Sequence, residues 1–442
     1  MSVLLSKYGR LFLLPLFALA AFLAAFFYFG YPGGYDAPTV AQVPAESITA
    51  PFSTLGELPL FPPTEKGTLL VDGLHGNDFT KQELSVLLAR VAQRGYQVEV
   101  AGQASRFGGF SSQDPGSRLA QLQEKLRRAD SLAVLMPDSP FTNEEADLVE
   151  DFVTRKGGKL LLIADPTRPS QINSLANRFG IAFQPDYLYN MVEYDLNFQN
   201  IYLRQFEPHP ITQGLTQIAL YTAGSVKAPT PGLALADGNT RSSMTERVEP
   251  FYPLASAAGG RVVALADFTF MIPPRNSILD NDRLVSNIAG FLTSSQRSFD
   301  LTDFPHFFKD DVDILLGRSP LFDLAAQVKG MLADFQTASN IRGVEDITKD
   351  TLFLGLYQDS PQVAQYLEVA GIQLDGVLRT PFTPNIERRD TAIILLHRGQ
   401  ERHVLVILGD SEDALRDAVS LLTSGRFRDG LVGDFVGVYR TP

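Results

Sequence analysis

Apolar and polar positions between residues 132 and 166 predict a strand, a loop, a helix, a turn and a second strand. Residues 132–136 form a short apolar run, and residues 159–164 form another. Between these runs, Thr142 can cap a helix with Glu145 three residues later. Two glycines follow this helix, and its apolar stripe consists of Leu148, Phe152 and Val153. Such units build parallel α/β sheets, whose ligands lie beyond the carboxyl ends of the strands.

The same pattern extends on both sides of this unit and predicts one α/β domain over residues 67–296. Because strands alternate with helices in its first half, that half should be a parallel sheet with right-handed crossovers. The segment HPITQGLTQIAL predicts a turn that enters another strand. We expect further strands at 68–71, 96–101 and 260–267, and helices at 80–95, 117–128, 173–180 and 283–294.

The remaining chain, residues 297–442, predicts a second and smaller α/β domain. Its apolar runs at 391–398 and 402–408 are separated by a short polar turn and predict a hairpin. Ser411 is placed to cap an amphipathic helix that continues to residue 423. The other expected elements are strands at 312–317, 351–356 and 434–440 and helices at 320–335 and 360–370.

The apolar run with the most direct bearing on location covers residues 11–31, which include no charged side chain. A helix of this length crosses a bilayer once. Lys7 and Arg10 precede the run, and no basic residue follows it until Lys66, so the positive-inside rule places the N-terminus in the cytoplasm. A cleavable signal peptide is the alternative, since residues 18–20 read Ala-Leu-Ala. Either interpretation puts the remainder of the chain outside the cytoplasm.

Residues 32–66 are rich in Pro, Gly, Ala, Ser and Thr and show little helical or strand period. This composition predicts an extended stalk. The expected organisation is therefore a cytoplasmic tip with a transmembrane anchor at 1–31, the stalk at 32–66, and α/β domains at 67–296 and 297–442.

The charge balance and the missing cysteines exclude several kinds of chemistry. The 442 residues include 50 acidic and 38 basic side chains, which give a net charge of −12. Such a charge argues against nucleic acid and anionic lipid as general partners. The chain has no cysteine, so it forms no disulfide, no thiolate metal site and no cysteine nucleophile.

The loop DGLHGND after the first predicted strand is the strongest candidate site. It brings Asp72, His75, Asn77 and Asp78 to the carboxyl edge of the sheet, where polar groups converge on ligands. His75 can serve as a general base near neutral pH if a partner holds a nucleophile or water. The alternative is that Asp and Asn satisfy backbone donors in a tight loop and cap the following helix.

Further candidates follow the next two strands, and they suggest a hydrolase as the rival interpretation. Asp138 and Ser139 follow the strand at 132–136. Asp165, with Arg168 close behind it, ends the strand at 159–164 where a related enzyme would carry its nucleophile. A Ser139, His75 and Asp165 triad is conceivable, but Ser139 stands in PDSP and not in a glycine-flanked nucleophile elbow. No paired-histidine or cysteine spacing supports a metal site, and no cofactor is expected.

Residues 187–202 combine aromatic and amide side chains in a way that allows two interpretations. They can offer stacking and amide contacts to a sugar or peptide, or they can pack in the core and at a sheet edge. The residues concerned are Tyr187, Tyr189, Tyr194, Phe198 and Tyr202, with Asn190, Asn197 and Asn200.

Four ordered motifs between residues 68 and 292 carry a family resemblance. They are VDGLHGNDFTKQEL, PDSPFTNEEADLVEDFVTRKGGKLLLIADP, HPITQGL and ADFTF followed by NDRLVSNIAGFL. With them the domain resembles an amidotransferase-like domain of unknown function in exported bacterial proteins. It is similar also to the domain of gliding-motility ABC-transporter accessory proteins and intraflagellar-transport proteins. The resemblance implies a flavodoxin-like sheet related to class I glutamine amidotransferases, mostly without their Cys-His pair. This chain lacks the cysteine too, so the activity is not carried over.

These observations lead to a functional expectation. We expect a single-pass membrane protein whose bulk is extracytoplasmic and which acts as a non-catalytic binding or scaffold subunit of a cell-envelope or ABC-transporter-type assembly. The alternatives are an envelope hydrolase that uses His75 and Asp165, and a carbohydrate-binding surface protein. Expected partners are the membrane and envelope or transporter proteins, with glycan as a further possibility and no nucleic acid.

Overall fold

The computed structural model describes residues 2–30, 66–105, 109–245, 247, 249–309 and 311–440. The expected stalk therefore lies outside the described residues, apart from Lys66. At the N-terminus, α1 covers Ser2–Ala25 and a π-helical turn covers Phe26–Gly30. Within the described part of the chain, no helix combines the length and the apolar character needed to cross a lipid bilayer. The predicted transmembrane helix is therefore not supported by the structure.

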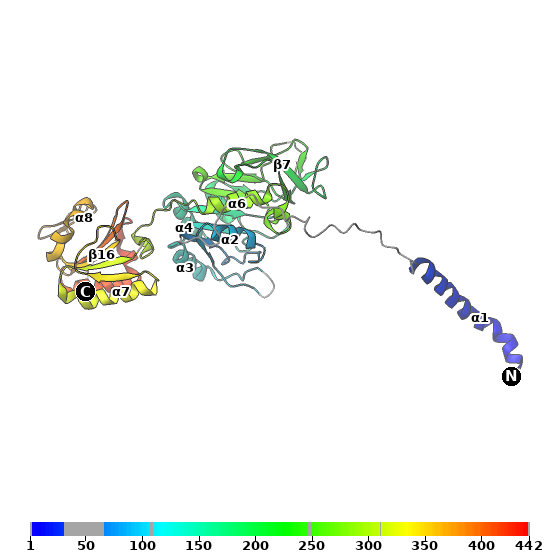
Figure 1. Cartoon of the computed structure of the whole chain (residues 1–442), viewed down its shortest axis with the longest axis horizontal. Coiled ribbons are helices and arrows are strands. Elements are labelled where there is room, and N and C mark those ends of the chain that lie inside the picture. Colours follow the sequence, from blue (N-terminus) through cyan, green and yellow to red (C-terminus); the bar gives the residue numbers. More distant parts are fainter. Residues whose placement is uncertain are drawn as a thin grey trace, which may run out of the picture. The chain divides into compact units, whose positions relative to one another are not determined.

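The first large sheet has nine strands and is mixed rather than parallel throughout (Figure 1). Its parallel half has the order β2-β1-β3-β4-β13. These strands lie where the apolar runs predicted them, which confirms an α/β class with parallel strands. Their bounds are Gly67–Val71 for β1, Tyr96–Val100 for β2, Ser131–Leu135 for β3, Lys159–Ile163 for β4 and Val262–Leu265 for β13.

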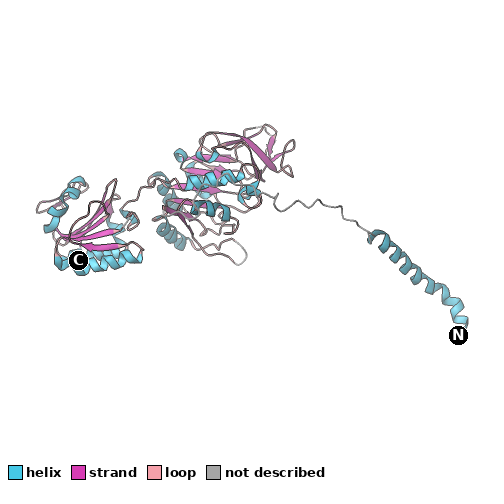
Figure 2. Ribbon diagram, in the orientation of Figure 1, coloured by secondary structure: helices cyan, strands magenta, loops and turns pink. Residues whose placement is uncertain are grey.

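Helices cover both faces of this parallel half (Figure 2). Leu87 and Val91 of α2, with residues of α6, pack on one face, and Leu122 of α3 and Val149 of α4 pack on the other. Thr142 and Glu145 form the predicted capping box of α4. The helices are α2 at Ser85–Ala92, α3 at Pro115–Leu126, α4 at Asn143–Thr154, α5 at Asn173–Ala176 and α6 at Asn281–Leu292.

The antiparallel half was largely missed by the sequence interpretation, which placed only one strand there. It extends the sheet from β13 in the order β12-β10-β7-β8. Most of these strands have three or four residues, too few for a period-two pattern to stand out. They are β7 at Asn200–Phe206, β8 at Ile218–Tyr221, β10 at Ala234–Ala236 and β12 at Leu254–Ala257. Two small ladders join β6 at Leu188–Asn190 to β11 at Thr240–Ser242, and β5 at Ala182–Phe183 to β9 at Val226–Lys227.

The second large sheet has seven strands in the order β15-β14-β16-β20-β19-β22-β21. The first four are parallel, and β19 and β20 form the predicted antiparallel hairpin. Helices α7 and α9 pack on one face and α8 on the other. The strands are β14 Val312–Leu316, β15 Ser339–Arg342, β16 Thr351–Leu356, β19 Thr391–Arg398, β20 His403–Gly409, β21 Leu431–Val432 and β22 Val436–Arg440. A small ladder pairs β17 Gln373–Leu374 with β18 Leu378–Arg379, and the helices are α7 Phe322–Asp334, α8 Ala364–Val369 and α9 Glu412–Ser424.

A buried charge cluster ties the segment after α6 to the first domain. The Lys156 Nζ lies 2.8 Å from Asp303 Oδ1 and 3.1 Å from Asp300 Oδ2. The Arg297 guanidinium donates to the same Asp303 carboxylate at 2.9 Å and to the Leu126 carbonyl at 2.6 Å. Because all four charged side chains are at most one tenth exposed, the cluster holds residues 297–303 firmly in place.

Candidate functional site

The first predicted loop folds into a buried polar cluster beneath the carboxyl edge of β1 and β3. Asp72 follows β1 directly, and its carboxylate accepts hydrogen bonds from His75 Nδ1 at 3.0 Å and Asn77 Nδ2 at 3.1 Å. Asn77 also donates to the Leu135 carbonyl at the end of β3, at 2.8 Å. The loop is thereby pinned to both strands, and Asp72, His75 and Asn77 are at most 1 % exposed.

Two helical residues that the sequence interpretation did not select complete this cluster. Glu145 Oε2 lies 3.4 Å from His75 Nε2, a charge contact without the alignment of a hydrogen bond. The Arg118 guanidinium donates to Glu145 at 3.0 Å and to the Gln113 and Pro140 carbonyls. Phe141 stacks on the imidazole with ring centroids 3.7 Å apart. We call Asp72, His75, Arg118 and Glu145 the buried quartet.

The quartet balances its charges when His75 is protonated. Burial by itself lowers the pKa of His75, but the Asp72 and Glu145 carboxylates outweigh it and raise the pKa to about 9. Burial raises the pKa of Glu145, but contacts with His75 and Arg118 and the Thr142 backbone N–H lower it to about 2. Two cations and two anions therefore enclose one another near neutral pH, which is how buried charges are tolerated.

The sequences of α3 and α4 contain a signal for Arg118 and Glu145, which the sequence interpretation did not select. Arg118 stands four residues before Leu122 on the buried face of α3, and Glu145 stands four residues before Val149 on the buried face of α4. A charged side chain on an apolar stripe is rarely buried without a partner. Each stripe therefore predicts that its charge is paired inside the protein, although it does not name the partner.

The cluster occupies the place where a doubly wound sheet usually holds its ligand. In the order β2-β1-β3-β4 the chain places β2 on one side of β1 and places β3 and β4 on the other side. Ligands of such sheets bind at this switch point, between β1 and β3. Here the loops close on each other instead. Asp78 N donates to the Met136 carbonyl at 3.1 Å, and Ser139 N donates to the His75 carbonyl at 2.9 Å. The crevice between the loops is thus filled by the chain itself.

The turn after β3 is strained at Met136. Met136 has φ of +37°, which is unusual for a residue other than glycine, and its side chain is fully buried. A nucleophile elbow places its reactive residue on a sharp strand-to-helix turn of this kind. The residue at this strained turn is therefore a thioether, and Asp165 lies two residues after the end of β4.

The other predicted residues separate into distinct environments. Asp165 is buried and accepts hydrogen bonds from Thr167 Oγ1 at 2.6 Å and Thr269 Oγ1 at 3.0 Å. Arg168 donates to the Asp78 carbonyl at 2.7 Å and to Glu83 at 2.6 Å. Asp78 is half-buried and Asp138 is exposed. Ser139 Oγ lies 2.6 Å from Ser112 Oγ at the surface. The described contacts join neither Ser139 Oγ nor Asp165 to the His75 ring, so the conceivable triad is not assembled.

A second buried carboxylate stands beside Asp165. Asp267 follows β13, and it accepts hydrogen bonds from Tyr221 N at 2.7 Å and Thr269 N at 2.6 Å. Burial and the neighbouring Asp165 carboxylate raise the pKa of Asp267 well above its usual value. The sequence contains a signal for this pair, because Ala-Asp-x-Thr occurs at both 164–167 and 266–269. Since backbone and threonine donors already occupy these carboxylates, the pair serves to hold the two loops together.

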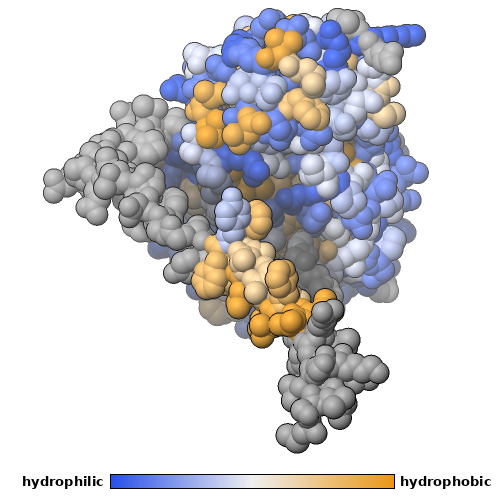
Figure 3. Space-filling view, turned by 90° about the vertical axis from the view of Figure 1, so that its right-hand side faces the viewer, coloured by the Kyte–Doolittle hydropathy of each residue, from blue (hydrophilic) through white to orange (hydrophobic). Residues whose placement is uncertain are grey.

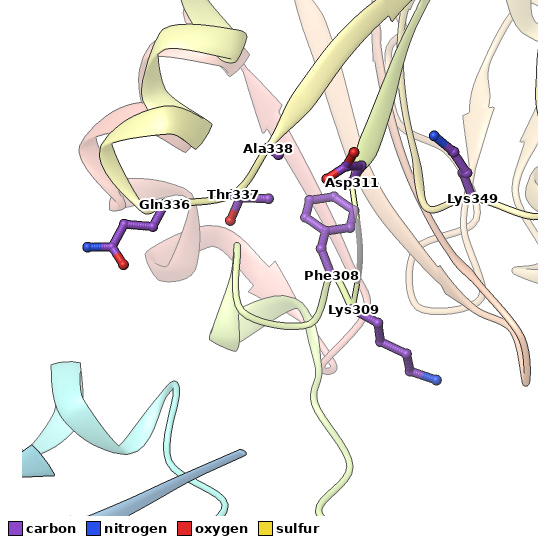
Figure 4. Close-up of a pocket in the computed structure, with 7 residues that line it drawn as sticks. All are labelled: Phe308, Lys309, Asp311, Gln336, Thr337, Ala338 and Lys349. Carbon is purple, nitrogen blue, oxygen red and sulfur yellow. The ribbon is translucent and has the colours of Figure 1, made fainter. Parts of the chain in front are cut away.

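Neither a metal-binding cluster nor a converging hollow adds a second site among the described residues. Among the described residues, no group of three or more His, Cys, Asp or Glu side chains is arranged to hold a metal ion. A hollow of about 510 Å³ lies at the amino ends of β14, β15 and β16, the edge opposite to the usual ligand edge (Figure 4). In Figure 4 the side chains of Lys309, Gln336 and Lys349 point in different directions and do not converge.

The comparisons with known proteins include a weak structural similarity and no family match. No protein-family model matches the chain, and no curated protein matches it. A solved structure described as the mmIFT52 N-terminal domain is similar with a TM-score of 0.40 and 14% sequence identity. The match covers 52% of this chain and 98% of that chain. This match is a weak counterpart of the intraflagellar-transport resemblance, and the amidotransferase-like family is not confirmed. We infer no activity from the match.

The quartet makes stability depend on pH in a defined direction. Because the folded-state pKa of His75, about 9, lies above the usual 6.5, its protonation stabilises the fold fully below pH 6.5. This stabilisation, about 3 kcal/mol, should be lost as the pH rises through 9. Urea unfolding of the wild type and of His75→Gln at pH 6 and pH 10 measures it. An equal loss in both proteins would contradict the assignment.

Proposed function

We propose that this protein is a non-catalytic binding or scaffold subunit of a cell-envelope or transporter-type assembly. The observation that supports this proposal best is the enclosure of His75. Its ring is 0% exposed, both of its nitrogen atoms face carboxylates, and Phe141 covers one ring face. A general base must come within hydrogen-bond reach of the proton that it removes. In this fold a substrate has no route to the imidazole, so the rival hydrolase would first have to open the quartet.

The proposed location rests on the sequence. The uncharged run at residues 11–31 follows Lys7 and Arg10, and the next basic residue is Lys66. We propose that this run holds the chain at the membrane with its bulk outside the cytoplasm. A resemblance to transporter accessory proteins agrees with this location.

We expect the full chain, purified from gently solubilised membranes, to retain protein partners and to hydrolyse none of a set of glycan, ester and amide substrates. His75→Gln and Asp165→Asn should leave partner retention unchanged when far-UV circular dichroism shows that they are folded. Asp417→Asn, an exposed change on α9, is the matched control. The hydrolase would be established instead if the wild type and Asp417→Asn hydrolysed a substrate that the folded His75→Gln and Asp165→Asn variants did not hydrolyse. Absence of the chain from the membrane fraction would contradict the proposed location.

A further inference from the structure

The loop between β6 and β7, residues 191–198, exposes apolar side chains at its surface. Leu196 is 89% exposed, Val192 72% and Met191 66%, while Tyr194 and Phe198 are each more than two fifths exposed. Figure 3 views the molecule from the right-hand side of Figure 1, and on the upper part of the folded chain small orange patches lie among polar side chains. We call residues 191–198 the apolar loop. Clustered exposed apolar side chains on a folded protein mark an interaction site.

The apolar loop is held in shape by its own polar groups. Asn190 Oδ1 accepts hydrogen bonds from Val192 N at 2.9 Å and Glu193 N at 3.0 Å, and Asn190 Nδ2 donates to Asp237. Asn200 Nδ2 donates to the Asp195 carbonyl at 2.7 Å. The side-chain amides of Asn190 and Asn200 therefore shape the loop. A preformed loop loses little conformational entropy when a partner binds it.

Aromatic rings extend this surface along β6. Tyr187 and Tyr189 have ring centroids 6.3 Å apart, and Tyr189 meets Phe198 edge-on at 6.2 Å. Tyr187 and Tyr189 are half-buried. Tyrosine, phenylalanine and methionine are enriched at the centres of protein interfaces, where a few such residues supply most of the affinity.

The charges around the apolar loop restrict its occupant. The loop carries Glu193 and Asp195 and no basic residue. Arg204 beside it is neutralised by Glu193, with contacts of 2.5 and 2.7 Å, and Asp237 lies close by. Opposite Tyr189, Arg241 donates to the Gly238 and Thr240 carbonyls of its own turn. With Glu193 paired to Arg204, the remaining charge on the loop is the Asp195 carboxylate. This negative charge repels an anionic membrane and opposes pairing with a second copy of the same surface.

We propose that the apolar loop is the docking surface for a protein partner whose contact site is an apolar pocket bordered by Lys or Arg. Leu196 and Phe198 enter the pocket, and the basic border faces Asp195. This proposal rests on the proposed scaffold function and gives it a specific surface and a partner chemistry.

The absence of cysteine from the chain allows a direct test. Leu196→Cys, labelled with a polarity-sensitive dye, is the reporter, and Val344→Cys is the control, because Val344 is 83% exposed on the second domain. The probes are vesicles of phosphatidylcholine, vesicles that also contain phosphatidylglycerol, the chain itself at rising concentration, and the purified partner that copurifies with the wild type. A blue shift at Leu196 with the partner alone, weakened by salt, is expected. A shift with vesicles or with the chain itself, or none with the partner, would overturn the proposal.

Affinity measurements separate this proposal from the scaffold function on which it rests. We expect Leu196→Asp to weaken the affinity for the partner about tenfold or more and Val344→Asp to leave that affinity unchanged. Glu193→Lys should weaken binding too, and most at low salt. Unchanged affinity in Leu196→Asp would disprove the docking surface while the scaffold function survives. A wild-type chain that retains no partner would disprove both.

Discussion

Replacing Glu145 by Gln should lower the free energy of unfolding by about 3 kcal/mol, because it removes one anion from a buried set of two cations and two anions. Gln keeps the side-chain length and an oxygen that can cap α4, so the lost charge is the main change. Without the negative charge of Glu145, the Arg118 guanidinium keeps its contacts with the Gln113 and Pro140 carbonyls but has no anionic partner. The pKa of His75 should fall for the same reason. Urea unfolding at pH 7, followed by far-UV circular dichroism, measures the difference.

Glu144→Gln provides the matched control for this prediction. Glu144 stands in the same first turn of α4 and is exposed, so its replacement should change the stability by less than about 0.5 kcal/mol. A similar loss in the two variants would mean that the charge matters through the helix dipole and not through the quartet. A negligible loss in Glu145→Gln would show that the quartet is not closed in solution.

The second large effect is expected at the charge cluster that follows α6. Asp303→Asn should lower the stability by about 3 kcal/mol, because Lys156 and Arg297 would lose the carboxylate that they share. The Arg297 side chain is 1% exposed, so water cannot compensate its charge. Because the chain has two large sheets, calorimetry should follow the transitions separately. We expect the unfolding transitions of the two sheets to overlap in the wild type and to occur at different temperatures in Asp303→Asn.

Asp323→Asn is the control for the cluster, since Asp323 is exposed in the first turn of α7. Its thermal unfolding should coincide with that of the wild type. If Asp303→Asn lowers all transitions equally, the cluster contributes to stability but does not couple the two parts. Unchanged unfolding of Asp303→Asn would contradict the buried pairing altogether.

The position of the parallel strands could be predicted because each is a run of buried apolar residues. Residues 159–163, for example, read Lys-Leu-Leu-Leu-Ile and match β4, in which four of the five residues are buried. The antiparallel half could not be predicted in this way. In β10 only Ala234, Leu235 and Ala236 form the strand, and its pairing with β7 includes a register shift. Such strands depend on their neighbours more than on their own sequence.

The candidate site was predicted in part. The sequence placed the polar loop after β1 at the carboxyl edge of the sheet, but it suggested open residues that face a crevice. Asp165 was expected there too, yet its carboxylate is occupied by Thr167 and Thr269. The aromatic segment at 187–202 allowed two interpretations, and the structure shows that its asparagines shape the loop while several of its rings remain partly exposed.

The sequence alone determined which stretches form the parallel strands and their helices, because burial periodicity and helix caps are local properties. It also determined that the chain has no cysteine chemistry. Only the tertiary structure decided what the polar residues do. Arg118 and Glu145 are 27 residues apart and pair with each other because α3 and α4 pack on the same face of the sheet, and Glu145 in turn contacts His75. Because of that packing, the polar loop after β1 forms a closed set of paired charges, although its composition is typical of an active site.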